Sequence, residues 1–362
     1  MANNGAYPKQ YLITFLTIFF LGLGLLVVTS IYIQPLEGDL TRMGGYSERD
    51  FGWNIPRMIL SDNVKLANKY DKYYDIVVLG DSFSNSGIWQ TILANNTNLS
   101  FVTLHWDQTN IDDILNNPFF RKNPPKLLIA ETGIRAFPLR FSSENKSCEL
   151  INETHAVAEI ALENNGVNSY LIKRQRNTET HWSEINLNFA LTYIKNSFLR
   201  LAVNNDFTRV KKYKLNRSDL FSNRASNEIL LLNTWFDSKL WSEEDISKAI
   251  CFASNIQNKV QSNGKTYFML LSIPDKGTVY RNYVSNPEYS NVDRLTNGLS
   301  KSDVNVPKLE SNLFQAIEHG EKDVYLPNDT HFGTKGYEIT AQSILNLISD
   351  NGEMALSSSG KQ

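Results

Sequence analysis

Three residues of this sequence are suited in type and spacing to acyl-transfer chemistry. Ser82 stands within residues 80–83 (Gly-Asp-Ser-Phe), directly after an apolar run, and residues 328–331 read Asn-Asp-Thr-His. A serine hydroxyl is a weak nucleophile unless a neighbouring base takes its proton. In an extended backbone, residues two apart point to the same side, so Asp329 can orient the imidazole of His331. We therefore interpret Ser82 as a nucleophile, His331 as its base and Asp329 as the orienting acid.

Taken singly, each motif also has a plainer interpretation. Gly-Asp-Ser after a strand is commonly only a turn, and Asp-Thr-His is commonly a surface loop that leads into a helix N-terminus. Their occurrence together favours catalysis. The other four histidines have no metal-ligand spacing to a further histidine or cysteine, so we predict neither a metal site nor a cofactor.

The elements that must position these residues alternate along the chain. Short apolar runs at 75–79, 99–105, 126–130 and 266–272 predict strands, and residues 111–117, 242–264 and 334–349 predict helices. Such alternation indicates an α/β fold with a mainly parallel sheet. Ser82 would then lie at the carboxyl end of a strand, where open parallel sheets bind their ligands.

The two motifs together resemble those of the SGNH (GDSL-like) superfamily. Ordinary members carry Asp-x-x-His, but the matching position here is Asn328, and the Asp-x-His spacing is similar to the alginate O-acetyltransferase-like branch. Residues 273–276 (Ile-Pro-Asp-Lys) with Tyr280, and residues 325–327 (Tyr-Leu-Pro), are also in the style of that branch. The resemblance spans roughly residues 75–140 and 265–348, and it implies an SGNH-type three-layer fold.

The sequence departs from that branch in several places. Phe332 replaces its usual Trp, the serine motif precedes the Asp-x-His motif, and the superfamily's middle Gly and Gly-x-Asn segments are absent as such. Residues 131–135 instead resemble a Glu-x-x-x-Arg variant. The backbone N–H of Ser82 is therefore the first candidate for an oxyanion donor. The further candidates for oxyanion or substrate contacts are Asn85, Gln108, Thr132, Arg135 and Tyr280.

The N-terminal region contains an uncharged apolar run over residues 11–33, longer than the ~20 residues that span a bilayer. It predicts one transmembrane helix, with a cytoplasmic stub at 1–10 and the rest of the chain outside the cytoplasmic membrane. A cleaved signal peptide is the alternative. We further expect a connector at 34–74, a catalytic domain at 75–350 with a polar or helical insertion at about 141–240, and a disordered tail at 351–362.

The composition of the chain bears on its expected partners and on its cysteines. The 362 residues carry a net charge of −2, with no basic stripe, so nucleic-acid binding is not expected. Cys148 and Cys251 can form a disulfide in an exported domain or remain free and buried.

The resemblance implies O-acetylation of an exported polysaccharide through an acetyl-serine intermediate, with acetyl groups supplied by a multi-spanning membrane acyltransferase. A carbohydrate acetyl esterase with the same triad and a non-catalytic scaffold of an export complex are the alternatives.

Overall fold

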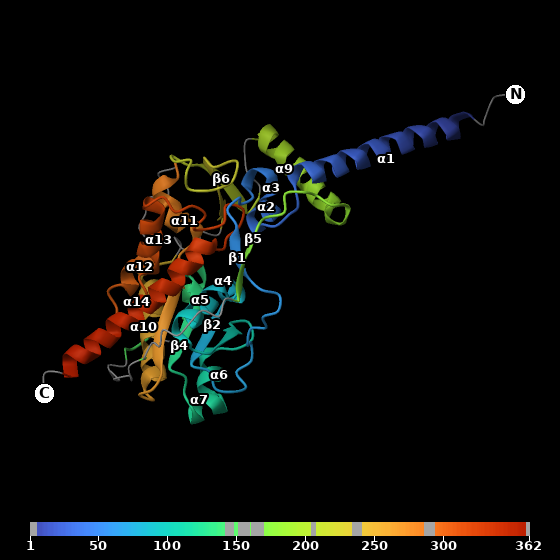
Figure 1. The fold of residues 1–362 in the computed structure, drawn as a ribbon. Helices are drawn as coiled ribbons and strands as arrows, with labels where there is room; N and C mark the ends of the chain where they lie inside the picture. Colours follow the sequence, from blue (N-terminus) through green and yellow to red (C-terminus); the bar gives the residue numbers. More distant parts are fainter. Residues whose placement is uncertain are drawn as a thin grey trace.

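A four-stranded parallel sheet forms the centre of the molecule (Figure 1). The computed structural model describes residues 6–141, 148–150, 160, 170–203, 208–233, 241–285 and 294–359. The strand order is β3-β2-β4-β8, and all three pairings are parallel. Each strand begins within a residue or two of its predicted start, which confirms the α/β prediction. The strands are β2 (Ile76–Gly80), β3 (Phe101–His105), β4 (Leu127–Gly133) and β8 (Tyr267–Ile273).

Helices cover both faces of this sheet. In β2, Ile76 and Val78 belong to one buried apolar cluster, and Val77 and Leu79 belong to another on the opposite face. Both sides of the strand therefore pack, which explains its continuous apolar run. The first face is covered by α5 (Ile88–Thr97), α13 (Leu309–Glu318) and α14 (Thr334–Ser359). The second is covered by α6 (Ile111–Asn116), α7 (Pro118–Lys122) and α10 (Glu243–Gln261). The predicted three-layer arrangement is confirmed.

Of the three helices predicted from the sequence, two have nearly the expected bounds, and the third is longer than expected. Helix α10 begins after Ser242, whose side chain accepts from Asp245 N in a capping box. Helix α14 runs on to Ser359, ten residues beyond its expected end, so the expectation of a disordered tail is wrong for 351–359. Residues 360–362 lie outside the described residues. The remaining short helices are α4 (Ser82–Asn85), α8 (Phe137–Arg140), α11 (Lys276–Tyr280), α12 (Arg294–Leu299) and the 3-10 turns at 134–136, 182–184 and 281–283.

The insertion at 141–240 is mixed rather than polar and helical. It contains the helix α9 (Leu187–Val203), but its described parts also form three strands. Strand β5 (Leu171–Arg174) pairs antiparallel with β1 (Arg57–Leu60), and β6 (Val210–Lys214) pairs antiparallel with β7 (Glu228–Leu232). A disulfide joins Cys148 to Cys251 in α10 and so ties the insertion to the core.

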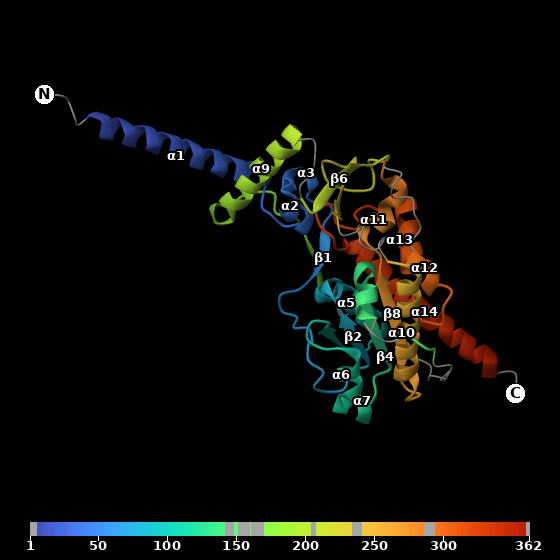
Figure 2. The same cartoon turned by 180° about the vertical axis from the view of Figure 1, so that it is seen from behind.

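The N-terminal segment leaves the domain as a single long helix, α1 (Ala6–Ile33), which projects away from the body in both views (Figures 1 and 2). Residues Pro8–Ile33 are long and apolar enough to cross a membrane. The chain then continues through α2 (Asp39–Gly44), α3 (Glu48–Phe51) and β1. These elements pack on the domain, so much of the expected connector is part of the folded body.

Candidate active site

Ser82 is the first residue of α4, on the turn that follows β2. Its side chain is exposed, and its backbone N–H is one of the helix N-terminal donors without an acceptor inside the helix. Asp81 is the N-cap, and its Oδ1 accepts from Phe83 N at 3.1 Å. The turn therefore presents the Ser82 hydroxyl and the Ser82 backbone N–H at the carboxyl end of the sheet, as the sequence predicted.

Gly80 is needed on this turn because other atoms approach it closely. A Cβ at Gly80 would lie 2.3 Å from Ser84 Oγ and 2.9 Å from Glu131 Oε2. A glycine at a sharp turn often adopts a positive φ angle. However, the φ of Gly80 is not among the positive values, so the contact with Ser84 and Glu131 is the reason for glycine.

The side chain of Glu131 binds the turn that carries Ser82. It is fully buried in β4, and its Oε2 accepts from Asp81 N at 2.8 Å and from Ser84 Oγ at 2.6 Å. Burial and the neighbouring Asp81 carboxylate raise the pKa of Glu131 well above its ordinary value. Burial would raise the pKa of Asp81 as well. Its hydrogen bonds with Glu131 and from Gly133 N, together with the positive charge of Arg140, outweigh burial and lower that pKa. These opposite shifts favour a proton on Glu131 and a negative charge on Asp81.

Asp329 and His331 are joined by a hydrogen bond, as their spacing on an extended segment predicts. His331 Nδ1 lies 2.7 Å from Asp329 Oδ1, and the same oxygen accepts from His331 N at 3.0 Å. Burial disfavours both the Asp329 carboxylate and the His331 imidazolium. The hydrogen bond and the attraction between these opposite charges outweigh that effect. The pKa of Asp329 is consequently lowered and that of His331 is raised. Nδ1 faces the carboxylate, which leaves Nε2 for the reacting hydroxyl.

The segment after α1 supports this pair from behind. Asp39 N donates to Asp329 Oδ2 at 3.1 Å, and Leu40 N donates to the carbonyl of Asn328 at 3.0 Å. Asn328 Nδ2 donates to the buried Glu48 at 2.8 Å, and Gly38 N donates to the other oxygen of that carboxylate at 2.7 Å. Burial raises the pKa of Glu48. Residues 37–48 therefore clamp the loop that carries the orienting acid.

Lys276 holds the same loop from the other side. Its Nζ is buried and donates to the carbonyls of Leu326 at 2.8 Å and Pro327 at 2.9 Å. Burial lowers the pKa of Lys276 to about 7. The Pro-Asp-Lys run of the sequence thus supplies a residue that positions the loop rather than one that contacts substrate.

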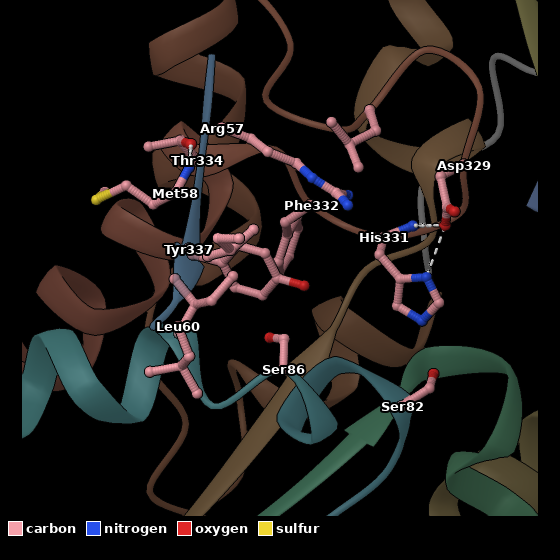
Figure 3. Close-up of a pocket in the computed structure, with 13 residues that line it drawn as sticks. Arg57, Met58, Leu60, Ser82, Ser86, Asp329, His331, Phe332, Thr334 and Tyr337 are labelled. Carbon is pink, nitrogen blue, oxygen red and sulfur yellow. Dashed lines mark hydrogen bonds and ion pairs between the residues drawn. The ribbon is translucent and has the colours of Figure 1, made fainter. Parts of the chain in front are cut away.

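A cavity of about 340 Å³ opens beside the triad (Figure 3). One side of it is lined by Ser82, Asp329 and His331. Strand β1 contributes Arg57 and three apolar residues to the opposite wall. Figure 3 shows the guanidinium of Arg57 directed into this space and the second ring nitrogen of His331 on the side of Ser82. The cavity places a cationic side chain and the candidate nucleophile in one substrate-sized space.

Ser82 and His331 share this cavity but do not form the expected bond of 2.6–3.2 Å. No hydrogen bond joins the Ser82 hydroxyl to the ring within the described part of the chain. The ring instead packs at 4.9 Å, centroid to centroid, against Phe83. A rotation of the short Ser82 side chain can change its distance to the ring, and such bonds often tighten only when substrate binds.

The five further candidates fall in different places. Asn85 and Gln108 are exposed near the sheet edge but do not line the cavity. Thr132 is buried and accepts from Arg140 Nη1 at 2.9 Å, which removes it from a direct role. Tyr280 was wrong as a substrate contact, because it is fully buried, stacks on a core aromatic ring and accepts from a backbone N–H. Arg135 lies 4.0 Å from Asp275 and lines a second, small cavity beyond Phe83.

Asp39, Asp329 and His331 also lie close enough together to hold a metal by distance alone. Several of these atoms already have protein partners. Asp329 Oδ1 bonds to His331, Asp329 Oδ2 accepts from Asp39 N, and the Asp39 carboxylate pairs with Arg42. These contacts account for the close approach of the three side chains without an ion.

The structure thus combines a three-layer fold with a serine after one parallel strand and an Asp-x-His loop beside it. Residues 219–362 match the family model described as "SGNH hydrolase-like domain, acetyltransferase AlgX". This match confirms the resemblance to the acetyltransferase branch, and it supports an acyltransferase or esterase of the SGNH type. It contains the Asp329–His331 loop and does not extend to Ser82. No curated protein and no solved structure matches the chain.

Sequence reasoning missed Glu48 and Arg57, which come from the expected connector. Neither lies in a motif, since an isolated acid and an isolated base near an apolar segment are ordinary surface residues. A weak signal existed only for Arg57, which begins a short apolar run at residues 57–60. That run predicts a strand but does not identify what the strand faces.

Proposed function

We propose that this chain is a membrane-anchored O-acetyltransferase that modifies an exported polysaccharide through an acetyl-serine intermediate. The observation that carries the proposal is the bonded Asp329–His331 pair, which faces the same cavity as Ser82. The family match to an acetyltransferase domain supports the reaction class. The residues that would act are Ser82, His331 and Asp329.

In the first half-reaction, His331 Nε2 takes the proton of Ser82 as Oγ attacks the acetyl carbonyl of the donor. The negative charge on the carbonyl oxygen is met by N–H donors, of which Ser82 N is the best placed. His331 then gives its proton to the departing donor oxygen, and Ser82 carries the acetyl group. Asp329 keeps the imidazole in the required tautomer throughout.

In the second half-reaction, a sugar hydroxyl enters the cavity and gives its proton to His331 as it attacks the acetyl carbon. The bond to Ser82 Oγ breaks, and His331 returns the proton to the serine. Water in place of the sugar would make the enzyme a carbohydrate esterase with the same triad. Arg57 can hold a polar group of the acceptor in the cavity, which favours a bound sugar over unheld water.

The proposed location is the outer side of the cytoplasmic membrane. Helix α1 is long and apolar enough to serve as the anchor. The disulfide between Cys148 and Cys251 is the kind of bond that persists in an oxidising compartment, which supports export of the domain. A multi-spanning membrane acyltransferase is the proposed source of acetyl groups, and a gene for one beside this gene would favour transfer over hydrolysis.

The experiment uses the full chain in detergent with an acetyl ester donor and a panel of oligosaccharides. Mass spectrometry should find acetylated sugar, and rapid acid quenching should trap an acetyl group on the peptide that contains Ser82. Ser82→Ala should abolish both products. Ser86→Ala is the matched control, because it removes a second hydroxyl from the same cavity and should leave the acetyl-enzyme intact.

Hydrolysis alone across the panel would establish the esterase instead. A non-catalytic scaffold predicts neither product, and it predicts normal polymer acetylation in cells that carry Ser82→Ala at normal protein levels.

A further inference from the structure

Helix α9 carries an apolar face on which three large side chains are strongly exposed. Leu191, Phe198 and Leu201 are 56%, 68% and 86% exposed. Together with Leu187 and Ile194 they recur at a spacing of three and four residues, so they lie on one face of the helix. A continuous exposed apolar stripe of this kind marks an interaction surface.

The opposite face of α9 is bound to the domain. Arg200 donates from Nη1 and Nη2 to the carbonyls of Gly44 and Gly45, both at 2.8 Å, and Asn196 Nδ2 donates to Gly44 at 3.2 Å. Phe189 is buried. The helix is therefore fixed in place with its apolar face outward, and its exposure is not the result of a loose segment.

The position of α9 relative to α1 identifies what covers this face. Asn186 N, just before α9, donates to Ser30 Oγ at 2.9 Å, and α9 crosses α1 close to the domain end of α1 (Figures 1 and 2). At 1.5 Å per residue, a bilayer core of about 30 Å takes about 20 residues. A span that begins at Tyr11 therefore leaves the core near Ser30, at the level of α9.

The side chains around α9 suit the boundary between lipid and water. Trp182, shortly before the helix, is 84% exposed. Tryptophan is enriched at this depth of the membrane. The helix contains Lys195 and Arg200 but no acidic residue, and a lysine at the edge of an apolar face can extend its charge to the headgroups.

We propose that α9 lies in the outer interface of the membrane, with Leu191, Phe198 and Leu201 inserted among the lipids. This inference rests on the anchoring by α1 proposed above. Helix α9 binds Gly44 at the end of α2, and the start of α2 supports Asp329. Lipid contact at α9 therefore fixes the orientation of the domain and holds the catalytic cavity at a set height above the membrane.

The test places single fluorescent labels on the full chain in phosphatidylcholine vesicles that contain lipids with nitroxide quenchers at known depths. Phe198→Cys reports on α9, Leu21→Cys on the exposed surface of α1, and Lys122→Cys on α7 at the far end of the domain. The native cysteines are paired and do not react. The label at 198 should be quenched at about 5–10 Å below the headgroups. The label at 21 should be quenched more deeply, and the label at 122 should be unaffected.

Quenching at 21 without quenching at 198 would overturn the proposal for α9 and leave the anchor intact. Quenching at neither position would overturn the anchor as well. Absence of quenching at 198, together with an oxidant-induced disulfide between copies of the unlabelled Phe198→Cys variant, would assign the face to a second copy of this chain, which also overturns the proposal.

Discussion

Glu48 offers the sharpest test of how the catalytic loop is held, because its carboxylate joins the chain after α1 to the loop before His331. In Glu48→Ala, Gly38 N and Asn328 Nδ2 lose their acceptor while they remain buried. Each buried donor without a partner costs about 1–3 kcal/mol, so the two cost about 2–6 kcal/mol of the 5–15 kcal/mol typical of a folded domain. The free energy of unfolding should fall by that amount.

Activity should fall as well, because Asn328 adjoins Asp329. A displacement of about 1 Å in a catalytic group can cost about 100-fold in rate. We expect a loss of that order in kcat for hydrolysis of a chromogenic acetyl ester, measured at a temperature where circular dichroism shows the variant to be folded.

Glu48→Gln is the matched variant. Its amide oxygen can still accept from Gly38, and its amide nitrogen can donate to Asn328 Oδ1, which has no partner in the described structure, once the Asn328 amide turns over. It should keep most activity. Asp75→Ala is the control for stability alone, because Asp75 accepts from Ser100 N and Oγ at the opposite end of the sheet. Full activity per folded molecule in Glu48→Ala would refute the role of Glu48.

Three further results are expected for the triad and its support, and one for the disulfide. Ser82→Ala and His331→Ala should each remove most turnover, and the double variant should be little worse because the pair acts as one unit; Asp329→Ala should cost less. Because Asp329 raises the pKa of His331, and only the neutral imidazole is a base, kcat/KM should rise with pH through a pKa above 6.5, and Asp329→Asn should move that limb to lower pH. Glu131→Gln should be mild, since Glu131 is protonated, whereas Glu131→Ala should destabilise by about 2–6 kcal/mol through two lost acceptor contacts. Cys148→Ser should lower stability by up to about 4.7 kcal/mol, the value for a closed loop near 100 residues, and thermal denaturation with and without reductant would measure it.

Each of these has an outcome that contradicts it. Additive losses in the double variant would separate Ser82 from His331. An acid limb that does not move in Asp329→Asn would mean that another group titrates. Equal effects of the two Glu131 variants would argue against a protonated Glu131. An unchanged melting temperature under reductant would show that the disulfide adds nothing.

The sheet could be predicted because its signals are local. Four short apolar runs ended by polar or turn residues identify β2, β3, β4 and β8, and the capping box at Ser242 identifies the start of α10. The Asp329–His331 pair could be predicted for the same reason, since two residues on one extended segment meet without help from the rest of the fold.

The support of the site could not be predicted because its partners are remote. The bond between Glu48 and Asn328 joins residues 280 positions apart, and no local pattern marks either of them. The pairing of β1 with β5, which builds the wall that carries Arg57, is equally non-local. Tyr280 illustrates the converse error, because a motif position does not reveal whether its side chain faces the cavity or the core.

The clamp between residues 37–48 and the 328–331 loop has a consequence for biogenesis. Residues 37–48 leave the ribosome long before residues 326–331 are made. Until then Glu48 has no Asn328 to accept from, Ser82 has no base, and the cavity lacks the wall that carries the imidazole. Under the proposed mechanism, a nascent chain would therefore be inert toward acyl groups, and it would become competent only when its C-terminal part docks onto residues 37–48.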